Sequence, residues 1–136
     1  ISAEVAQASF RGEAPYVAAN AGSDLKKLKS GLLARAIKAG DAAVERIVRD
    51  AMRLMGRAIG GVVNLLAPDV VVLGGGLVEA VPRIVLEEAK AGIQETAMAP
   101  FLRQFRVVEA DLGDDATTLG AAALAAEGAV RPRARK

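Results

Sequence analysis

Three consecutive glycines follow directly after a run of aliphatic residues, and they form the best candidate for a functional site. The run covers residues 70–73, and the glycines are Gly74, Gly75 and Gly76. Ligands of open α/β sheets bind beyond the carboxyl ends of the strands. Glycines at that place permit positive φ and let a ligand approach the backbone, whose amides can face a phosphate. The alternative is a tight strand-to-helix turn that binds no ligand.

The spacing of these glycines argues against the two commonest phosphate-binding motifs. A Walker loop has the pattern GxxxxGK[ST], and no Lys followed by Ser or Thr comes after Gly76. A dinucleotide-binding fingerprint requires Gly or Ala where this chain has Glu79, whose side chain would crowd the packing of helix on strand. An NAD-binding half-domain therefore stays only as a weak alternative.

A second candidate is the acidic pair Asp114 and Asp115, within the stretch 112–121 that reads LGDDATTLGA. Paired carboxylates can bind a metal or act as a base. Aspartates at the start of a helix also satisfy free amides and suit the helix dipole. We favour capping, and we assign no catalytic and no metal-binding residue to this chain.

The composition limits the chemistry further, because the 136 residues include no histidine, cysteine or tryptophan. A Cys nucleophile, a Ser-His-Asp triad, a disulfide and a zinc site of thiolates or imidazoles are all excluded. No apolar run reaches the ~18 residues of a membrane span, and no secretion signal is present. We therefore expect a cytoplasmic protein with no membrane partner.

The positive charge belongs to the end of the chain. The formal net charge is +2, and residues 131–136 carry four positive charges, so the remainder has a net charge of 2 − 4 = −2. A basic tail can contact nucleic acid, but we favour a solvated terminus.

The first 40 residues indicate a helix over residues 2–10 and then a loop-rich segment, 11–30, with several turn residues. Within that segment we expect Ser23 to cap a short Lys-rich turn. Ser30 then caps a helix over residues 31–39.

The longest helix is predicted to begin after Asp41 as its N-cap and to end at Pro68. Gly56 and Gly60 leave a smooth strip where another backbone can approach. The second half is apolar on all sides, so we expect it to be the more deeply buried half. Apolar residues recur at helical spacing at Val44, Ile47, Val48, Ala51, Met52, Met55, Ile59, Val62, Val63 and Leu66.

The second half of the chain reads as strand, glycine loop, helix, strand and helix. The strands are expected at 69–73 and 105–110, and the helices at 81–98 and from Asp114 or Asp115 to residue 126. Apolar residues on both faces of the first strand indicate a parallel sheet covered on both sides. The small residues 120–123 would let the last helix press against that sheet.

Two stretches together resemble the C-terminal end of the ROK family. They are 64–76, which reads NLLAPDVVVLGGG, and 112–122, which reads LGDDATTLGAA. The pair Gly40-Asp41 before the long helix also fits, and the likeness covers roughly residues 36–126. The ROK family comprises bacterial sugar kinases, including glucokinase-like proteins, and related transcriptional repressors. The resemblance implies an α/β class: the C-terminal part of an actin-like ATPase (ribonuclease H-like) fold, helix-rich with a short parallel strand pair.

The resemblance also implies a role for the glycines. Gly74, Gly75 and Gly76 would form part of the adenosine-binding wall, with ATP and Mg as cofactors of the full-length parent. The family's DxGxT phosphate loop, its catalytic aspartate, its ExG sugar contact and its zinc ligands are absent from this chain. The expected division is a helix plus loop-rich segment over 1–30, the nucleotide-side lobe over 31–127, and a basic tail over 128–136.

Three functions follow as hypotheses. The chain is a fragment of an ATP-dependent sugar kinase, not catalytically complete alone, or a fragment of a sugar-responsive repressor, or a packing and dimerisation module. The first residue is Ile1 and not Met, which suits a piece of a longer protein. Expected partners are the missing N-terminal lobe, ATP or ADP, a second copy, and a sugar bound mainly by absent segments. Nucleic acid is a partner only if the parent is a repressor.

Overall fold

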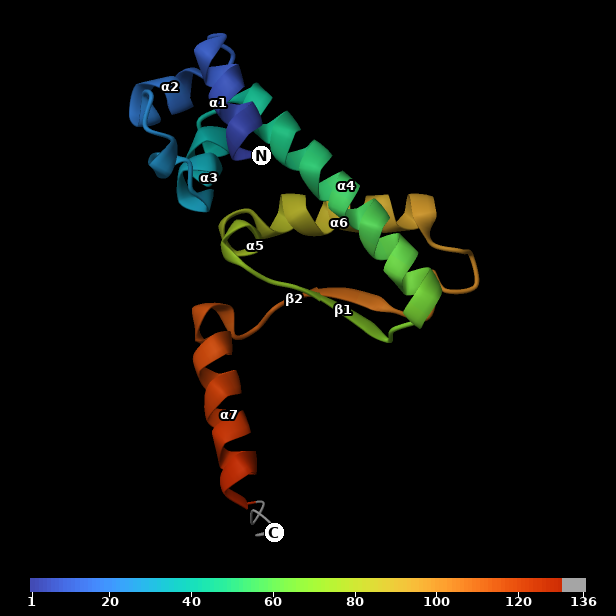
Figure 1. Cartoon of the computed structure of the whole chain (residues 1–136). Helices are drawn as coiled ribbons and strands as arrows, with labels where there is room; N and C mark the ends of the chain where they lie inside the picture. The colour runs from blue at the N-terminus through green and yellow to red at the C-terminus, as the bar shows by residue number, and fades with distance from the viewer. Residues whose placement is uncertain (131–136) are drawn as a thin grey trace.

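The computed structural model describes residues 1–130; the side chains of Asp114 and of 128–130, and all of 131–136, lie outside the description, so the basic tail is untested. Helices dominate, and one parallel pair of strands lies in the second half of the chain (Figure 1). In order the elements are α1 (Ser2–Phe10), α2 (Pro15–Ala21), the 3₁₀ helix η1 (Leu25–Lys27), α3 (Ser30–Lys38), α4 (Ala42–Leu66), β1 (Val70–Leu73), α5 (Gly76–Ala80), α6 (Pro82–Thr96), β2 (Arg106–Glu109), the 3₁₀ helix η2 (Gly113–Asp115) and α7 (Ala116–Val130).

The first three helices gather around the N-terminal half of α4 (Figure 1). Their shared core is small and aliphatic, which suits close packing of short helices. The expectation of a loop-rich segment at 11–30 was wrong in part, because α2 forms there with Pro15 in its first turn, where a missing amide is tolerated. Buried members of this core are Val5, Ala8, Val17, Leu32, Leu33, Ala36, Val44 and Val48.

The caps of these helices differ from those expected. Asp24, and not Ser23, caps the Lys-rich turn η1 by accepting a hydrogen bond from the Lys26 amide at 3.0 Å. Helix α3 begins at Ser30, one residue early, with no side-chain cap. Asp41 stands at the N-cap of α4, but its side chain makes no bond to that helix.

The carboxylate of Asp41 instead caps α2, a helix more than 20 residues earlier in the chain. It accepts hydrogen bonds from the backbone amides of Tyr16 at 3.3 Å and Val17 at 3.2 Å. Asp41 is 5% exposed, the one polar residue among those the described structure buries. A carboxylate satisfies free helix amides better than a neutral group does, so this contact holds α2 against the start of α4.

Helix α4 confirms the amphipathic prediction over its first half and contradicts it at its end. Val44, Val48 and Val63 are buried, whereas Val62 and Leu66 are 50% and 67% exposed. The second half is thus the less buried half, because no described element covers its outer side. The helix ends as expected before Pro68, with Ala67 in the left-handed region at φ 44°.

Glycines bring α4 and α6 into backbone contact, as the spacing of Gly56 and Gly60 predicted. A Cβ atom added at Gly56 would lie 2.9 Å from Cα of Ala89, and one added at Gly60 would lie 2.9 Å from Cβ of Thr96. Gly92 supplies the matching gap on α6, since a Cβ there would lie 2.8 Å from the Arg57 amide nitrogen. Three glycines therefore set the distance between the helices.

A ladder of ion pairs runs beside this crossing. Glu88 of α6 accepts from Arg49 and Arg53 of α4 at 2.9 Å each. Glu95 accepts from Arg53 at 2.8 Å and from Arg57 at 2.7 Å. Hydrogen bonds from Arg49 and Arg53 lower the pKa of Glu88, and those from Arg57 and Arg53 lower the pKa of Glu95.

This ladder predicts a loss of stability in acid. Lowered pKa values mean that the pairs stabilise the fold fully above the ordinary carboxyl value of 4.5 and lose that effect as the pH falls through and below it. Urea unfolding at pH 7 should show Arg53→Gln less stable than the unmodified chain, and the difference should shrink at pH 3.5. Arg83→Gln, which removes only a pair within α6, serves as the control. A difference that is equal at both pH values would contradict the prediction.

The strands pair in parallel as predicted, with Val70 opposite Arg106 and Leu73 opposite Glu109. Alternation along a strand places Val71 and Leu73 toward the helices, where Leu73 is 7% exposed. The opposite face is open, with Val72 60% exposed, so the expectation of a sheet covered on both sides was wrong.

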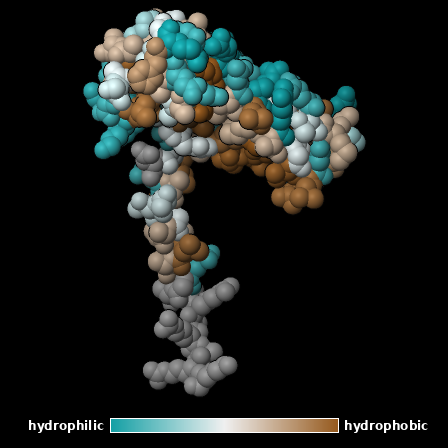
Figure 2. Space-filling model, turned by 45° about the horizontal axis from the view of Figure 1, so that its top comes forward, coloured by the Kyte–Doolittle hydropathy of each residue, from teal (hydrophilic) through white to brown (hydrophobic). Residues whose placement is uncertain are grey.

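The last helix does not cover that face. Figure 1 shows α7 pointing away from the rest of the molecule, and its side chains from Ala116 to Glu127 are all exposed. The expected packing of residues 120–123 on the sheet is therefore wrong. Exposed aliphatic side chains at the end of α4 and on β1 contribute apolar surface to the body, seen in brown in Figure 2. Within the described part of the chain, no helix is both long and apolar enough to cross a membrane.

Candidate functional site

The glycine loop lies at the carboxyl ends of the strands, as its sequence position predicted. All three glycines are exposed, and α5 begins at Gly76. Gly75 has φ 107° and ψ 165°, a region that residues with a Cβ atom essentially do not adopt. Nothing lies within 4 Å of a Cβ built there. The loop is therefore an open piece of backbone that a ligand can approach closely.

The structure places the second sequence motif beside the first. A Cβ on Gly74 would lie 3.0 Å from Cβ of Ala110, the residue that follows β2. A Cβ on Gly113 would lie 3.4 Å from Oε1 of Glu79, which is on α5. The ends of both strands, the glycine loop and η2 therefore share one edge of the sheet, the usual location of ligands in parallel sheets.

Ser30 at the start of α3 completes this edge from a distant part of the sequence. A Cβ at Gly76 would lie 3.0 Å from the Ser30 hydroxyl oxygen, so no side chain larger than hydrogen fits there without a shift. Ser30 was predicted only as a helix cap. Its place beside the loop depends on the packing of α3 on α5, which no local pattern reveals.

Positive charge collects on the same η1–α3 segment. A hollow with a volume of about 350 Å³ is lined by four cationic side chains and two others: Lys26, Lys27, Lys29 and Arg35, with Asn20 and Leu32. None of these cations forms an ion pair within the described residues. The potential in this hollow therefore favours an anionic ligand.

The acidic pair Asp114 and Asp115 is described only in part. Asp115 ends η2 directly before α7, and the side chain of Asp114 lies outside the described residues, so capping by Asp114 stays a prediction. Among the described side chains, no group of three or more His, Cys, Asp or Glu residues could hold a metal ion.

Comparison with models of protein families identifies the family of the chain. The model of the ROK family matches residues 9–128. The chain belongs to the ROK family. The residues that carried the resemblance, the glycine loop and the stretch 112–122, lie within this match and meet at one edge of the sheet. No curated protein matches the sequence closely enough to count as a relative.

Two solved structures share the fold. A candidate sugar kinase from Cytophaga hutchinsonii superimposes with a TM-score of 0.64 at 22% identity, over 88% of this chain and 41% of its own. A ROK family transcriptional regulator, a homologue of the E. coli MLC protein, gives 0.56 at 20% identity, over 76% of this chain and 27% of its own. This ROK chain therefore spans less than half the length of either neighbour.

Proposed function

We propose that this chain is the C-terminal, nucleotide-side part of an ATP-dependent ROK sugar kinase with an actin-like ATPase fold, located in the cytoplasm. It supplies a wall of the adenosine site and is not catalytically complete alone. The observation that carries the proposal is the exposed loop of Gly74, Gly75 and Gly76 at the carboxyl ends of two parallel strands, with Gly75 at φ 107°. The rest of the site belongs to segments outside this sequence.

The surroundings of the loop fit a nucleoside phosphate. Exposed backbone at Gly75 leaves room for a flat ring or a ribose, and Ser30 adds a hydroxyl group beside Gly76. The cations that line the hollow on η1 and α3, which form no ion pair with any described residue, favour an anionic ligand on that segment. The described residues offer no carboxylate cluster for Mg, so a metal that accompanies ATP would take its other ligands from the phosphates and from the absent lobe.

A ROK repressor is the alternative, favoured by the likeness to the transcriptional regulator. Its sugar-binding body has the same fold, and therefore the two parents predict the same backbone for this chain. They differ at the glycine loop, because only a kinase needs to bind a nucleotide there.

Replacement of Gly75 by alanine tests the nucleotide site. The Cβ would force a strained backbone and point into the open space of the loop, so we expect ADP to bind at least tenfold more weakly. Binding is measured by calorimetry and by NMR shifts of the loop amides. Gly12→Ala is the matched control, since Gly12 also has positive φ, 77°, and open space. Equal affinity for ADP in both variants would contradict the site.

An assay of the full-length parent separates the two functions. A kinase must release ADP in a sugar-dependent reaction, and a repressor must not. If the parent bound nucleotide without this turnover, the proposed adenosine site would be retained and the proposed kinase activity would be rejected.

A further inference from the structure

The hollow on η1 and α3 concentrates positive charge on a chain that is slightly acidic outside residues 131–136. Its volume of about 350 Å³ is at the lower end of the range for small-molecule sites. We call it the basic hollow. Four of its six lining residues are cationic, and they come from two elements and the residue between them: Lys26, Lys27, Lys29 and Arg35.

No carboxylate of a described residue lines the basic hollow. Its four cationic side chains are exposed, and none forms an ion pair within the described part of the chain. The acidic residue nearest in sequence is Asp24, whose carboxylate accepts from the Lys26 amide. The amide nitrogen of Asn20 donates to the Tyr16 carbonyl oxygen at 2.8 Å. Like charges held close together repel, so an anion bound among the cations would lower the electrostatic free energy.

The basic hollow opens on the side of α3 that faces away from the glycine loop. The Ser30 hydroxyl oxygen lies 3.0 Å from a Cβ built at Gly76. Leu32 and Arg35 line the hollow, and with 3.6 residues per turn they follow Ser30 around the helix by roughly 200° and 140°. A ligand in the basic hollow therefore does not occupy the nucleotide site proposed at the loop.

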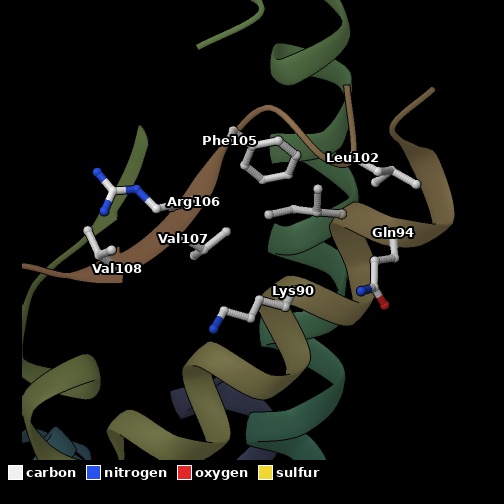
Figure 3. Close-up of a pocket in the computed structure, with 8 residues that line it drawn as sticks. Lys90, Gln94, Leu102, Phe105, Arg106, Val107 and Val108 are labelled. Carbon is white, nitrogen blue, oxygen red and sulfur yellow. The ribbon is translucent and has the colours of Figure 1, made fainter. Parts of the chain in front are cut away.

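A larger hollow, of about 600 Å³ between α6 and β2, lacks this concentration of charge. Its lining includes Ile93, which is 1% exposed. In Figure 3 Lys90 extends from α6 on one side of β2, whereas Arg106 projects from the other side of the strand. Strand alternation agrees, since Arg106 pairs with Val70 on the open face of the sheet. Cations on opposite faces do not hold one anionic group, which distinguishes this hollow from the basic one.

The types of cation in the basic hollow favour phosphate groups over carboxylates. A lysine ammonium is a compact point charge with three donors, which suits a tetrahedral group with charge on several oxygens. A planar carboxylate is matched best by the fork of an arginine, and the lining has one, Arg35. Four positive charges are best balanced by a ligand with more than one negative charge. The concave shape favours a small molecule over a long polymer, which needs an extended basic surface.

We propose that the basic hollow binds a small compound with two or more negative charges on phosphate, of the class of phosphate monoesters and diphosphates. The ammonium groups of Lys26, Lys27 and Lys29 surround the phosphate oxygens, and the Arg35 guanidinium donates to one phosphate group. The site is a second one on the chain, independent of the glycine loop.

The ligand class is tested with three probes: sodium diphosphate, inorganic phosphate and citrate. Each is titrated into the 136-residue chain at pH 7.5 and low salt, with amide shifts followed by NMR. Diphosphate should bind at least tenfold more tightly than inorganic phosphate, because it has more negative charge, and more tightly than citrate, whose comparable charge is on carboxylates. Shifts should fall at residues 26–35, and added salt should weaken binding. Equal affinity for diphosphate and citrate would overturn the proposal, as would shifts confined to residues 131–136.

Paired variants test the residues. Lys29→Gln with Arg35→Gln should weaken diphosphate about tenfold. Lys90→Gln with Arg103→Gln removes the same charge at exposed positions outside the basic hollow and should leave the affinity within twofold. Gly75→Ala should also leave it within twofold, which separates this site from the nucleotide site. Equal weakening in the two double variants would show attraction to net charge alone and would overturn the proposal.

A short single-stranded oligonucleotide tests the other class of polyanion. It is added at the same concentration of phosphate groups as diphosphate. Weaker shifts at residues 26–35 than those caused by diphosphate would support a small ligand. Stronger shifts there would assign the basic hollow to a nucleic-acid surface and would overturn the proposal.

Discussion

Replacement of Gly92 by alanine is expected to lower the free energy of unfolding by about 2 kcal/mol. The added Cβ would overlap the Arg53 carbonyl oxygen and would lie 2.8 Å from the Arg57 amide nitrogen and 3.0 Å from the Gly56 carbonyl carbon. These are backbone atoms of α4, which cannot turn aside as a flexible side chain would. Overpacking of this kind costs roughly 3 kcal/mol at its upper range, and the gain in helix propensity returns about 1.

Gly61→Ala is the matched control for this change. Gly61 stands in α4 next to Gly60, and nothing lies within 4 Å of a Cβ built there. Alanine should raise the free energy of unfolding by about 0.5–1 kcal/mol through helix propensity alone. Urea unfolding of both variants measures the two effects. If Gly92→Ala and Gly61→Ala changed the free energy of unfolding in the same direction, the packing of α4 on α6 would not depend on backbone contact.

The second large effect is expected at Asp41. Asp41→Ala should lower the free energy of unfolding by about 3 kcal/mol, because it leaves the Tyr16 and Val17 amides without an acceptor in a buried place. Asp41→Asn keeps one acceptor oxygen and should lose less. Hydrogen exchange should show that the amides of α2 lose protection first.

Asp24→Ala controls for the loss of an aspartate cap. Asp24 is exposed and bonds a single amide, that of Lys26, so its removal should cost less than 1 kcal/mol. Chemical unfolding and exchange rates of the two variants are compared under one set of conditions. Similar losses for Asp24 and Asp41 would mean that the carboxylate of Asp41 does not hold α2.

Local patterns predicted those parts of the fold whose cause is local. Helical spacing of apolar residues and the two glycines identified α4 and its contact strip. β-Branched runs before and after α6 predicted a parallel pair. Helix α2 was missed for two reasons. Its cap comes from Asp41, which is distant in the sequence, and its apolar pattern is short and flanked by turn residues. The open faces of α4, β1 and α7 were missed for another reason. An apolar pattern predicts that a face is buried, but it does not show whether another element of the chain packs against that face.

In the candidate site too, features with a local cause were predicted and features that depend on distant segments were not. The glycine loop was located from its sequence, since only glycine suits the backbone of position 75. Ser30 was not, because its place beside the loop depends on two segments that meet only in the folded chain. A serine directly before Gly31 offers no signal beyond a helix cap.

Helix α4 has a consequence for how the molecule unfolds. Its first half is part of the core of the N-terminal helices, and its second half carries α6 and, through it, the strands. One continuous helix of 25 residues thus runs through a single hydrophobic core, from the N-terminal helices to α6. Nucleation of a helix is the unfavourable step and extension is easy, so order in one half favours order in the other. The N-terminal helices and α6 should therefore melt in a single cooperative transition, and a proline in the middle of α4 would divide that transition into two.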